Sequence, residues 1–251
     1  MNYAMWLPDE ISIRVAIVLI VISYVTSAIS AAFGLGGGVA MLIALLSVSP
    51  PIVALPVHAL VQVGSNAGRA VMLRSHIMGG VVRWFIPGSI IGVMIASQLI
   101  VGLPIQWLQL ILALFILWSV LGPKMNSVTV PDKAYIAVGS VTSFATMFLR
   151  ATGPLLAAFL SPDRYGKHRT VATHAMCMST QHLIKIVAFG FLGFVLTQWL
   201  PLALLMIASG LLGTWTGAGL LKRLPETTFK WMFKGVLSLL ALRLLYRALE
   251  G

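Results

Sequence analysis

The longest apolar run of this chain is too long to be one membrane-crossing helix. It extends from Ile11 to about Leu46. As a single helix it would measure roughly 54 Å, against about 30 Å for the hydrocarbon core of a bilayer. The run must therefore break, and the segment 34–38, with the sequence GLGGG, is where glycine most weakens a helix. We expect a broken or re-entrant first helix.

The composition is that of a polytopic helical membrane protein. Hydrophobic residues make up 59% of the sequence and charged residues 9%, whereas soluble domains are about 45–50% apolar. Further apolar runs are long enough to cross a bilayer as helices. None shows the two-residue alternation of a barrel strand. The sequence predicts an all-α integral membrane protein.

The net charge of +11 does not indicate a nucleic-acid partner. The cations lie mostly in short gaps between apolar runs, as membrane orientation requires. The six acidic residues lie at the termini or in the gaps, so no carboxylate falls inside an apolar run. The single cysteine, Cys177, excludes an internal disulfide and a cysteine-based metal site.

A polar stripe occurs twice on otherwise apolar helices. Steps of four, seven, eight and eleven residues place its members on one helix face. Each copy has a histidine at one end and a cation at the other, and a face of this kind predicts a polar site within the membrane. The first copy comprises His58, Gln62, Ser65, Asn66 and Arg69, and the second, 116 residues later, comprises His174, Met178, Gln181, His182 and Lys185.

The offset of 116 residues extends beyond the stripes. Residues 134–160 align with 18–44 at the same offset, and the tripeptide TGP at 152–154 falls where the first half has its glycine run. We therefore predict two repeats of about four hydrophobic segments each. The first repeat spans residues 1–122, a polar linker spans 123–133, and the second repeat spans 134–251.

The basic gaps indicate how the repeats are oriented. The gaps at 74–83, 122–133, 161–169 and 222–230 are basic, whereas the turns at 102–106 and 197–201 carry no charge. All four basic gaps face one side of the membrane if each broken stretch is re-entrant, that is, enters the membrane and leaves it on the same side. The repeats are then inverted, as in many transporters; parallel repeats are the alternative.

Two cations of the stripes are candidates for binding an anion. Lys185 lies about sixteen residues along its helix from Arg169, which places it at membrane depth, where a charge is costly and usually functional. The alternative is that its side chain extends to the far interface. Arg69 occupies the matching position, but Arg74 follows it closely, which suggests a shallower place near a helix end.

The two breaks supply further candidates for substrate binding. The glycines of the first break would let backbone groups approach a ligand, or would only allow helices to cross closely. The second break would hold an anion beside exposed backbone N–H groups and an arginine, or that arginine would face lipid headgroups. The candidates are Gly36, Gly37, Gly38, Arg150, Thr152 and Gly153.

The histidines of the stripes have two interpretations. As proton carriers they suit transport coupled to pH, with protons as the coupling ion; as hydrogen-bond partners they satisfy buried helices. A metal site is not expected, because no carboxylate or second thiol is at hand and His174 and His182 are eight residues apart. Gln62, Ser65 and Gln181 are interhelical hydrogen-bonding residues by default. No cofactor is expected.

These features resemble one family of membrane carriers. The glycine-rich break in the first long helix, the polar helix second in each half, and the glycine-rich third helix after a basic gap are similar to the TauE/SafE family of sulfite and sulfonate transporters. The resemblance covers nearly the whole chain. It implies a multi-pass carrier in the cell inner membrane for a small sulfur-containing anion, such as sulfite, sulfoacetate or another organosulfonate. The chain departs from symmetry at 152–154, which leaves open whether both breaks bind substrate alike.

The residues and the resemblance both favour an anionic substrate. A cation carrier would place Asp or Glu in its pathway, and here the embedded charges are cations. We expect a secondary transporter that works by alternating access, with the small anion and the lipid bilayer as its partners. A passive anion channel and a membrane accessory subunit are the alternatives. An enzyme is not expected, since no nucleophile–base pair is found. The sequence leaves open whether the protein forms a homodimer.

Overall fold

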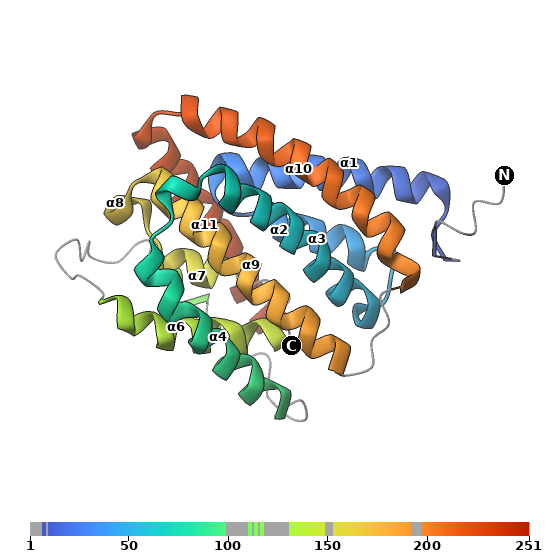
Figure 1. The fold of residues 1–251 in the computed structure, drawn as a ribbon, viewed down its shortest axis with the longest axis horizontal. Coiled ribbons are helices and arrows are strands. Elements are labelled where there is room, and N and C mark those ends of the chain that lie inside the picture. The colour runs from blue at the N-terminus through green and yellow to red at the C-terminus, as the bar shows by residue number, and fades with distance from the viewer. Residues whose placement is uncertain are drawn as a thin grey trace.

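The chain folds into a bundle of helices, and the residues that the structure describes contain no strand. The structure is a computed structural model, which describes residues 7–8, 10–98, 110–111, 113–114, 116–117, 131–148, 153–191 and 197–250. The predicted all-α class is confirmed. In chain order the α-helices are α1 (Ile13–Phe33), α2 (Gly37–Leu46), α3 (Pro51–Met72), α4 (Gly79–Gln98), α6 (Tyr135–Phe148), α7 (Gly153–Phe159), α8 (Pro162–Tyr165), α9 (Lys167–Phe191), α10 (Leu200–Arg223) and α11 (Glu226–Glu250) (Figure 1).

The first apolar run breaks within its glycine-rich segment. The chain leaves α1 through Gly34 and Gly36, whose φ angles of 85° and 101° would strain any other residue. Gly37 and Gly38, predicted to lie in the break, instead form the first turn of α2. The prediction was wrong there, and Gly37 serves a close helix contact instead: a Cβ at Gly37 would lie 1.7 Å from the Thr26 carbonyl oxygen of α1.

Both broken stretches turn back on themselves. Leu45, near the end of α2, packs in one cluster with Ala16 and Leu19, near the start of α1. In the second half, the Tyr135 hydroxyl at the start of α6 donates to the Phe159 carbonyl at the end of α7, at 3.3 Å. The link between α6 and α7 lies outside the described residues. Each stretch is therefore a helical hairpin.

Two helix pairs pack with their backbones in close contact through glycine. A Cβ on Gly213 of α10 would lie 2.1 Å from the Tyr24 carbonyl oxygen of α1. A Cβ on Gly92 of α4 would lie 2.1 Å from the Ser140 carbonyl oxygen of α6. Small residues allow this approach between helices in lipid. The pairs α1–α10 and α4–α6 form opposite sides of the bundle (Figure 1).

The helices that carry the polar stripes, α3 and α9, lie between these pairs and run antiparallel. The rings of His58 and His182 meet edge to face, with centroids 5.5 Å apart. Leu73, just after α3, shares a buried cluster with Val171, near the start of α9. α3 also packs against α10, and α9 against α4. The two stripes therefore face each other in the middle of the bundle.

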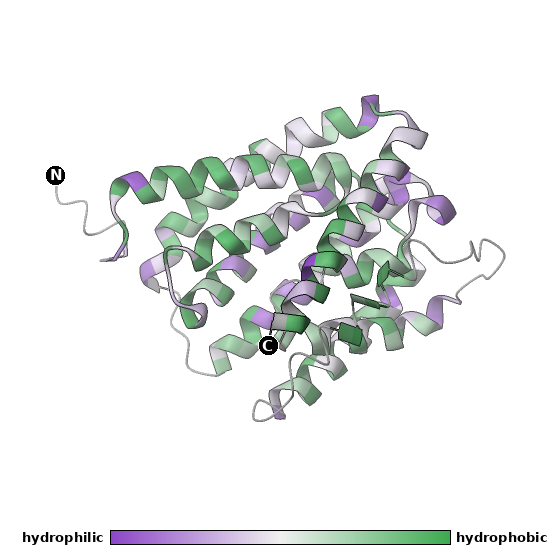
Figure 2. Cartoon of the chain, turned by 180° about the vertical axis from the view of Figure 1, so that it is seen from behind, coloured by the Kyte–Doolittle hydropathy of each residue, from purple (hydrophilic) through white to green (hydrophobic). Residues whose placement is uncertain are grey.

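The outer surface of the bundle suits a lipid environment. In the described part of the chain, three segments are long and apolar enough to cross a membrane: Ile13–Phe33, Gly79–Gln98 and Thr197–Arg223. Large apolar side chains on them face outward, such as Val18 and Met94, which are 54% and 63% exposed. Hydrophobic residues cover most of the length of the helices (Figure 2).

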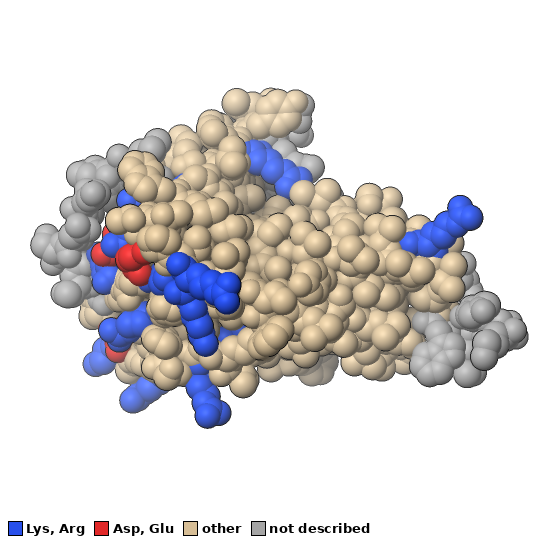
Figure 3. Space-filling view, turned by 90° about the horizontal axis from the view of Figure 1, so that it is seen from above, with Lys and Arg blue, Asp and Glu red and all other residues tan. Residues whose placement is uncertain are grey.

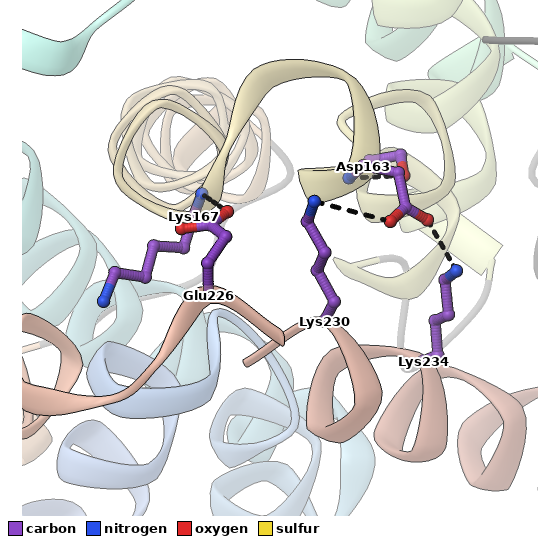
Figure 4. Close-up of polar contacts among 6 residues, drawn as sticks. Asp163, Lys167, Glu226, Lys230 and Lys234 are labelled. Atoms are coloured by element: carbon purple, nitrogen blue, oxygen red, sulfur yellow. Dashed lines mark hydrogen bonds and ion pairs between the residues drawn. The ribbon is translucent and has the colours of Figure 1, made fainter. Parts of the chain in front are cut away.

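Most lysines and arginines gather at one end of the molecule (Figure 3). At this end Asp163 of α8 pairs with Lys230 and Lys234 of α11, at N–O distances of 3.8 and 2.5 Å (Figure 4). The Glu226 carboxylate of α11 accepts a hydrogen bond from the backbone N–H of Lys167, at 2.8 Å. These contacts join the basic gaps 161–169 and 222–230 to each other.

A third basic gap reaches the same end. His76, in the gap between α3 and α4, stacks on His168 of α9 with ring centroids 5.1 Å apart. Burial and the neighbouring Lys167 lower the pKa of His168. Of the fourth basic gap the structure describes the last residues, and there the Asp132 carboxylate lies against Gly80 at the start of α4. The described parts of all four gaps thus lie together.

Cysteine labelling tests the sidedness of this arrangement. Ser75 and Lys222 are exposed at the basic end, and Gln198 is exposed at the opposite end, just before α10. Single cysteines at Ser75 and Lys222, in a Cys177→Ala background, are expected to react with an impermeant maleimide from the cytoplasmic side, and one at Gln198 from outside. The measurement compares intact cells with inverted vesicles. Labelling of Ser75 and Lys222 from opposite sides would contradict the arrangement.

Candidate functional site

A cavity of about 50 Å³ lies between α3 and α9, where the first turns of α2 and α7 meet the stripes. This is room for roughly three or four water molecules, or for one small oxyanion. Its walls come from both halves of the chain. Most of the predicted site residues line it: Gly36, Gly38, His58, Gln62, Asn66, Arg69, Gly153, His174, His182 and Lys185.

Other predicted site residues lie behind the cavity wall. The Ser65 hydroxyl donates to the Ser27 hydroxyl of α1 at 3.0 Å. The Gln181 amide donates to the Ser143 hydroxyl of α6 at 2.9 Å. These two residues join helices, and Gly37 packs against α1 as described above. Two further candidates, Arg150 and Thr152, lie outside the described residues.

Arg69 and Lys185 place two cations inside the bundle without a carboxylate. Their side chains are 2% and 3% exposed. Lys185 Nζ donates to the Thr146 carbonyl of α6 at 2.9 Å, whereas Arg69 Nε has no hydrogen-bond partner among the described residues. Among the described residues, no ion pair involves either cation. Burying an unpaired charge is costly, so this cavity favours an anion.

Arg69 lies near a helix end, as expected from the sequence, yet its side chain is buried. Arg69 is in the last turn of α3, and Arg74 beyond it is exposed, as the sequence indicated. However, α9 and α10 pack against α3, and Arg69 is among the largest fully buried side chains. Position near a helix end therefore does not make Arg69 accessible.

Two histidines hold the first turns of the short helices. His58 Nε2 donates to the Gly38 carbonyl of α2 at 2.9 Å, and His174 Nε2 donates to the Gly153 carbonyl of α7 at 3.1 Å. A carbonyl accepts and never donates, so each of these rings carries a hydrogen on Nε2. His182 differs, because neither of its ring nitrogens has a hydrogen-bond partner among the described residues.

The start of α2 adds a partial positive charge to the cavity. Gly36 caps this ten-residue helix without a side-chain hydrogen bond, and Gly36 and Gly38 both line the cavity. The first N–H groups of a helix have no acceptor within the helix and carry the positive end of its dipole. Backbone donors and two cationic side chains therefore converge on one small space.

Two cavity residues, Ser30 of α1 and Thr146 of α6, were not predicted from the sequence. Both are hydroxyl residues, and they are separated by the same offset of 116 residues as the stripes. The Thr146 carbonyl accepts the hydrogen bond from Lys185. A search for polar residues that recur at this offset would have found them.

Comparison with known proteins identifies the family. The model of the sulfite exporter TauE/SafE family matches residues 19–244, which include every residue that lines the cavity. The chain belongs to the TauE/SafE family. Members of this family are membrane transporters of sulfite and sulfonates. No curated protein and no solved structure matches the chain.

The cavity of this TauE/SafE protein is rich in hydrogen-bond donors. Arginine offers a planar fork of N–H groups and lysine a compact ammonium, and both bind oxyanions. In the part of the chain that the structure describes, no cluster of three or more His, Cys, Asp or Glu side chains could hold a metal ion. The arrangement is therefore suited to binding a small anion directly.

Substitutions at two neighbouring glycines test separately the role of the break in folding and its role at the cavity. A Cβ at Gly37 would collide with the Thr26 backbone, whereas a Cβ at Gly38 would lie 2.1 Å from the mobile amide end of Gln62. We expect Gly37→Ala to destabilise the fold by about 1–3 kcal/mol, since backbone must move. Gly38→Ala is expected to keep the fold, displace the Gln62 amide and weaken anion binding. Thermal unfolding and sulfite binding, measured on both purified variants, distinguish these effects. If Gly38→Ala lost as much stability as Gly37→Ala, the separation of the two roles would be contradicted.

Proposed function

We propose that this protein is a secondary transporter that carries a small sulfur-containing oxyanion, such as sulfite or an organosulfonate, across the cell inner membrane. The observation that carries the proposal is the pair of buried cations, Arg69 and Lys185, lining one cavity. No carboxylate pairs with either among the described residues. A bound anion would offset the poor solvation of both charges at once. Membership of the TauE/SafE family supports the same class of substrate.

The donors around the cavity suit the SO₃ group that sulfite and sulfonates share. Arg69 would bind two of the oxygens through its fork, and Lys185 would bind as a point charge from the opposite helix. The uncapped start of α2 would donate backbone N–H groups. Asn66 and Gln62 line the cavity between these donors. The anion thus takes the place of the acidic partner that neither cation has.

We further propose that residues 1–122 and 134–251, joined by 123–133, form two inverted repeats. Contacts that recur at nearly constant offset support this. The Ser65–Ser27 bond has a counterpart in the Gln181–Ser143 bond, and each helical hairpin is tied to a stripe by a histidine. The antiparallel course of α3 and α9 is what a two-fold axis in the membrane plane would produce.

Inverted halves provide a simple route to alternating access. The anion site lies where the two stripes meet, and each half contributes a hairpin, a histidine and a cation to it. A rocking movement of one half against the other would open the site to each side in turn while the binding residues stay in place. This cycle differs from a channel, because the site is never open to both sides.

Removing the charge of Lys185 tests the anion site. Lys185→Met keeps length and apolar bulk, and we expect it to weaken sulfite binding by about 2–4 kcal/mol, or roughly 30- to 1,000-fold in Kd. Because Arg69 is equally buried, Arg69→Met is expected to have a similar effect. Lys185→Arg should keep part of the affinity. Titration of sulfite into purified protein gives the affinities.

The exposed Arg74 supplies a matched control. Arg74→Met removes the same charge outside the cavity and should bind sulfite as the unaltered protein does. Removing an unpaired buried charge should also leave the empty Lys185→Met protein at least as stable as the parent. Wild-type affinity in Lys185→Met would place the anion site elsewhere.

Counterflow distinguishes a carrier from a channel. Proteoliposomes loaded with unlabelled sulfite should take up radiolabelled sulfite faster than empty ones, because a carrier that exchanges need not return empty. Uptake should saturate with sulfite concentration. A steady anion conductance without saturation or counterflow would contradict secondary transport.

A further inference from the structure

His182 is the cavity histidine whose ring is not committed to the fold. In the described structure, His58 and His174 each donate to a backbone carbonyl of a short helix. His182 is 4% exposed, and both its Nδ1 and its Nε2 lack a hydrogen-bond partner in the part of the chain that the structure describes. A neutral imidazole needs one donor and one acceptor, and leaving either unpaired in a buried place is unfavourable. The ring is therefore available to a ligand or a proton.

The ionisable groups that face His182 are all bases or cations. From α3 come His58, whose ring centroid is 5.5 Å away, and Arg69, which lines the same cavity. From α9 itself come His174 and Lys185. The described residues of α1, α2, α6 and α7 that line the cavity carry no ionisable side chain. When the cavity is empty, His182 thus stands in a positive potential that opposes protonation.

We infer that His182 takes up a proton when the anion binds, so that the protein carries anion and proton together. This inference rests on the proposed function. A bound oxyanion brings negative charge beside the ring, removes the net repulsion and offers an oxygen to accept a hydrogen bond from it. By linkage, a proton on His182 strengthens anion binding by the same factor as the anion strengthens proton binding.

The sign of the pH dependence follows from this coupling. Protonated His182 favours the bound anion, so binding is tightest at low pH and weakens as pH rises and the proton is lost. The proton is taken up from the side on which the anion enters, carried on the imidazole and released with the anion on the other side. A pH gradient would therefore drive the anion toward the less acidic compartment.

Proton uptake measured by calorimetry tests the inference. Sulfite is titrated into the protein in two buffers of different ionisation enthalpy, which gives the protons taken up per bound anion. Free sulfite has the same protonation in every titration, so differences between variants belong to the protein together with its bound anion. We expect His182→Gln to take up fewer protons than wild type, by up to one per anion. His76→Gln, which alters an exposed histidine outside the cavity, should match wild type.

The outcomes separate the two proposals. Undiminished proton uptake in His182→Gln would overturn the role of His182 while leaving the anion site intact. Absence of sulfite binding to the wild-type protein would overturn the proposed function itself. If His182→Gln binds sulfite too weakly to titrate, NMR of the histidine ring ¹⁵N signals in labelled wild-type protein tests the inference instead. One histidine should change from neutral to charged on addition of sulfite, and unchanged signals would overturn the inference.

Discussion

The architecture depends on the burial of two cations that have no acidic partner in the described part of the chain. Arg69 and Lys185 are almost inaccessible, and a charge in such a place costs several kcal/mol unless other groups offset it. The Thr146 carbonyl offsets part of this cost for Lys185, whereas Arg69 Nε makes no hydrogen bond. In the proposed function, the remaining cost would make the cavity selective, because a bound anion would remove it.

The helices are arranged so that these charges share one space. Glycine contacts let α10 approach α1 and let α4 approach α6, and these pairs hold α3 and α9 between them. The antiparallel crossing then brings a histidine of one stripe against a histidine of the other. His58 and His174 bond to α2 and α7, so a movement of either hairpin would change the walls of the cavity. In the proposed cycle, these contacts would link anion binding to conformational change.

Periodicity and length made much of this predictable. An apolar run too long for one helix had to break, and a polar stripe at helical spacing had to lie on one face, so the hairpin of α1 and α2 and most of the cavity wall followed from the sequence. The burial of Arg69 did not, because exposure near a helix end depends on neighbouring helices. Ser65 and Gln181 belong to the stripes, but their side chains bond to α1 and α6 instead of lining the cavity. The periodicity of one helix does not show which neighbouring helix a side chain contacts. The inverted repeat remains a prediction.

The position of a bound anion tests the central claim most directly. Selenite has the shape and charge of sulfite, and selenium can be located in crystals by anomalous scattering. The account predicts one strong peak between α3 and α9, with selenite oxygens about 2.7–2.9 Å from nitrogens of both Arg69 and Lys185. The peak should disappear in Lys185→Met. A peak at the basic end of the molecule with none in the cavity would contradict the claim that the two buried cations form the anion site.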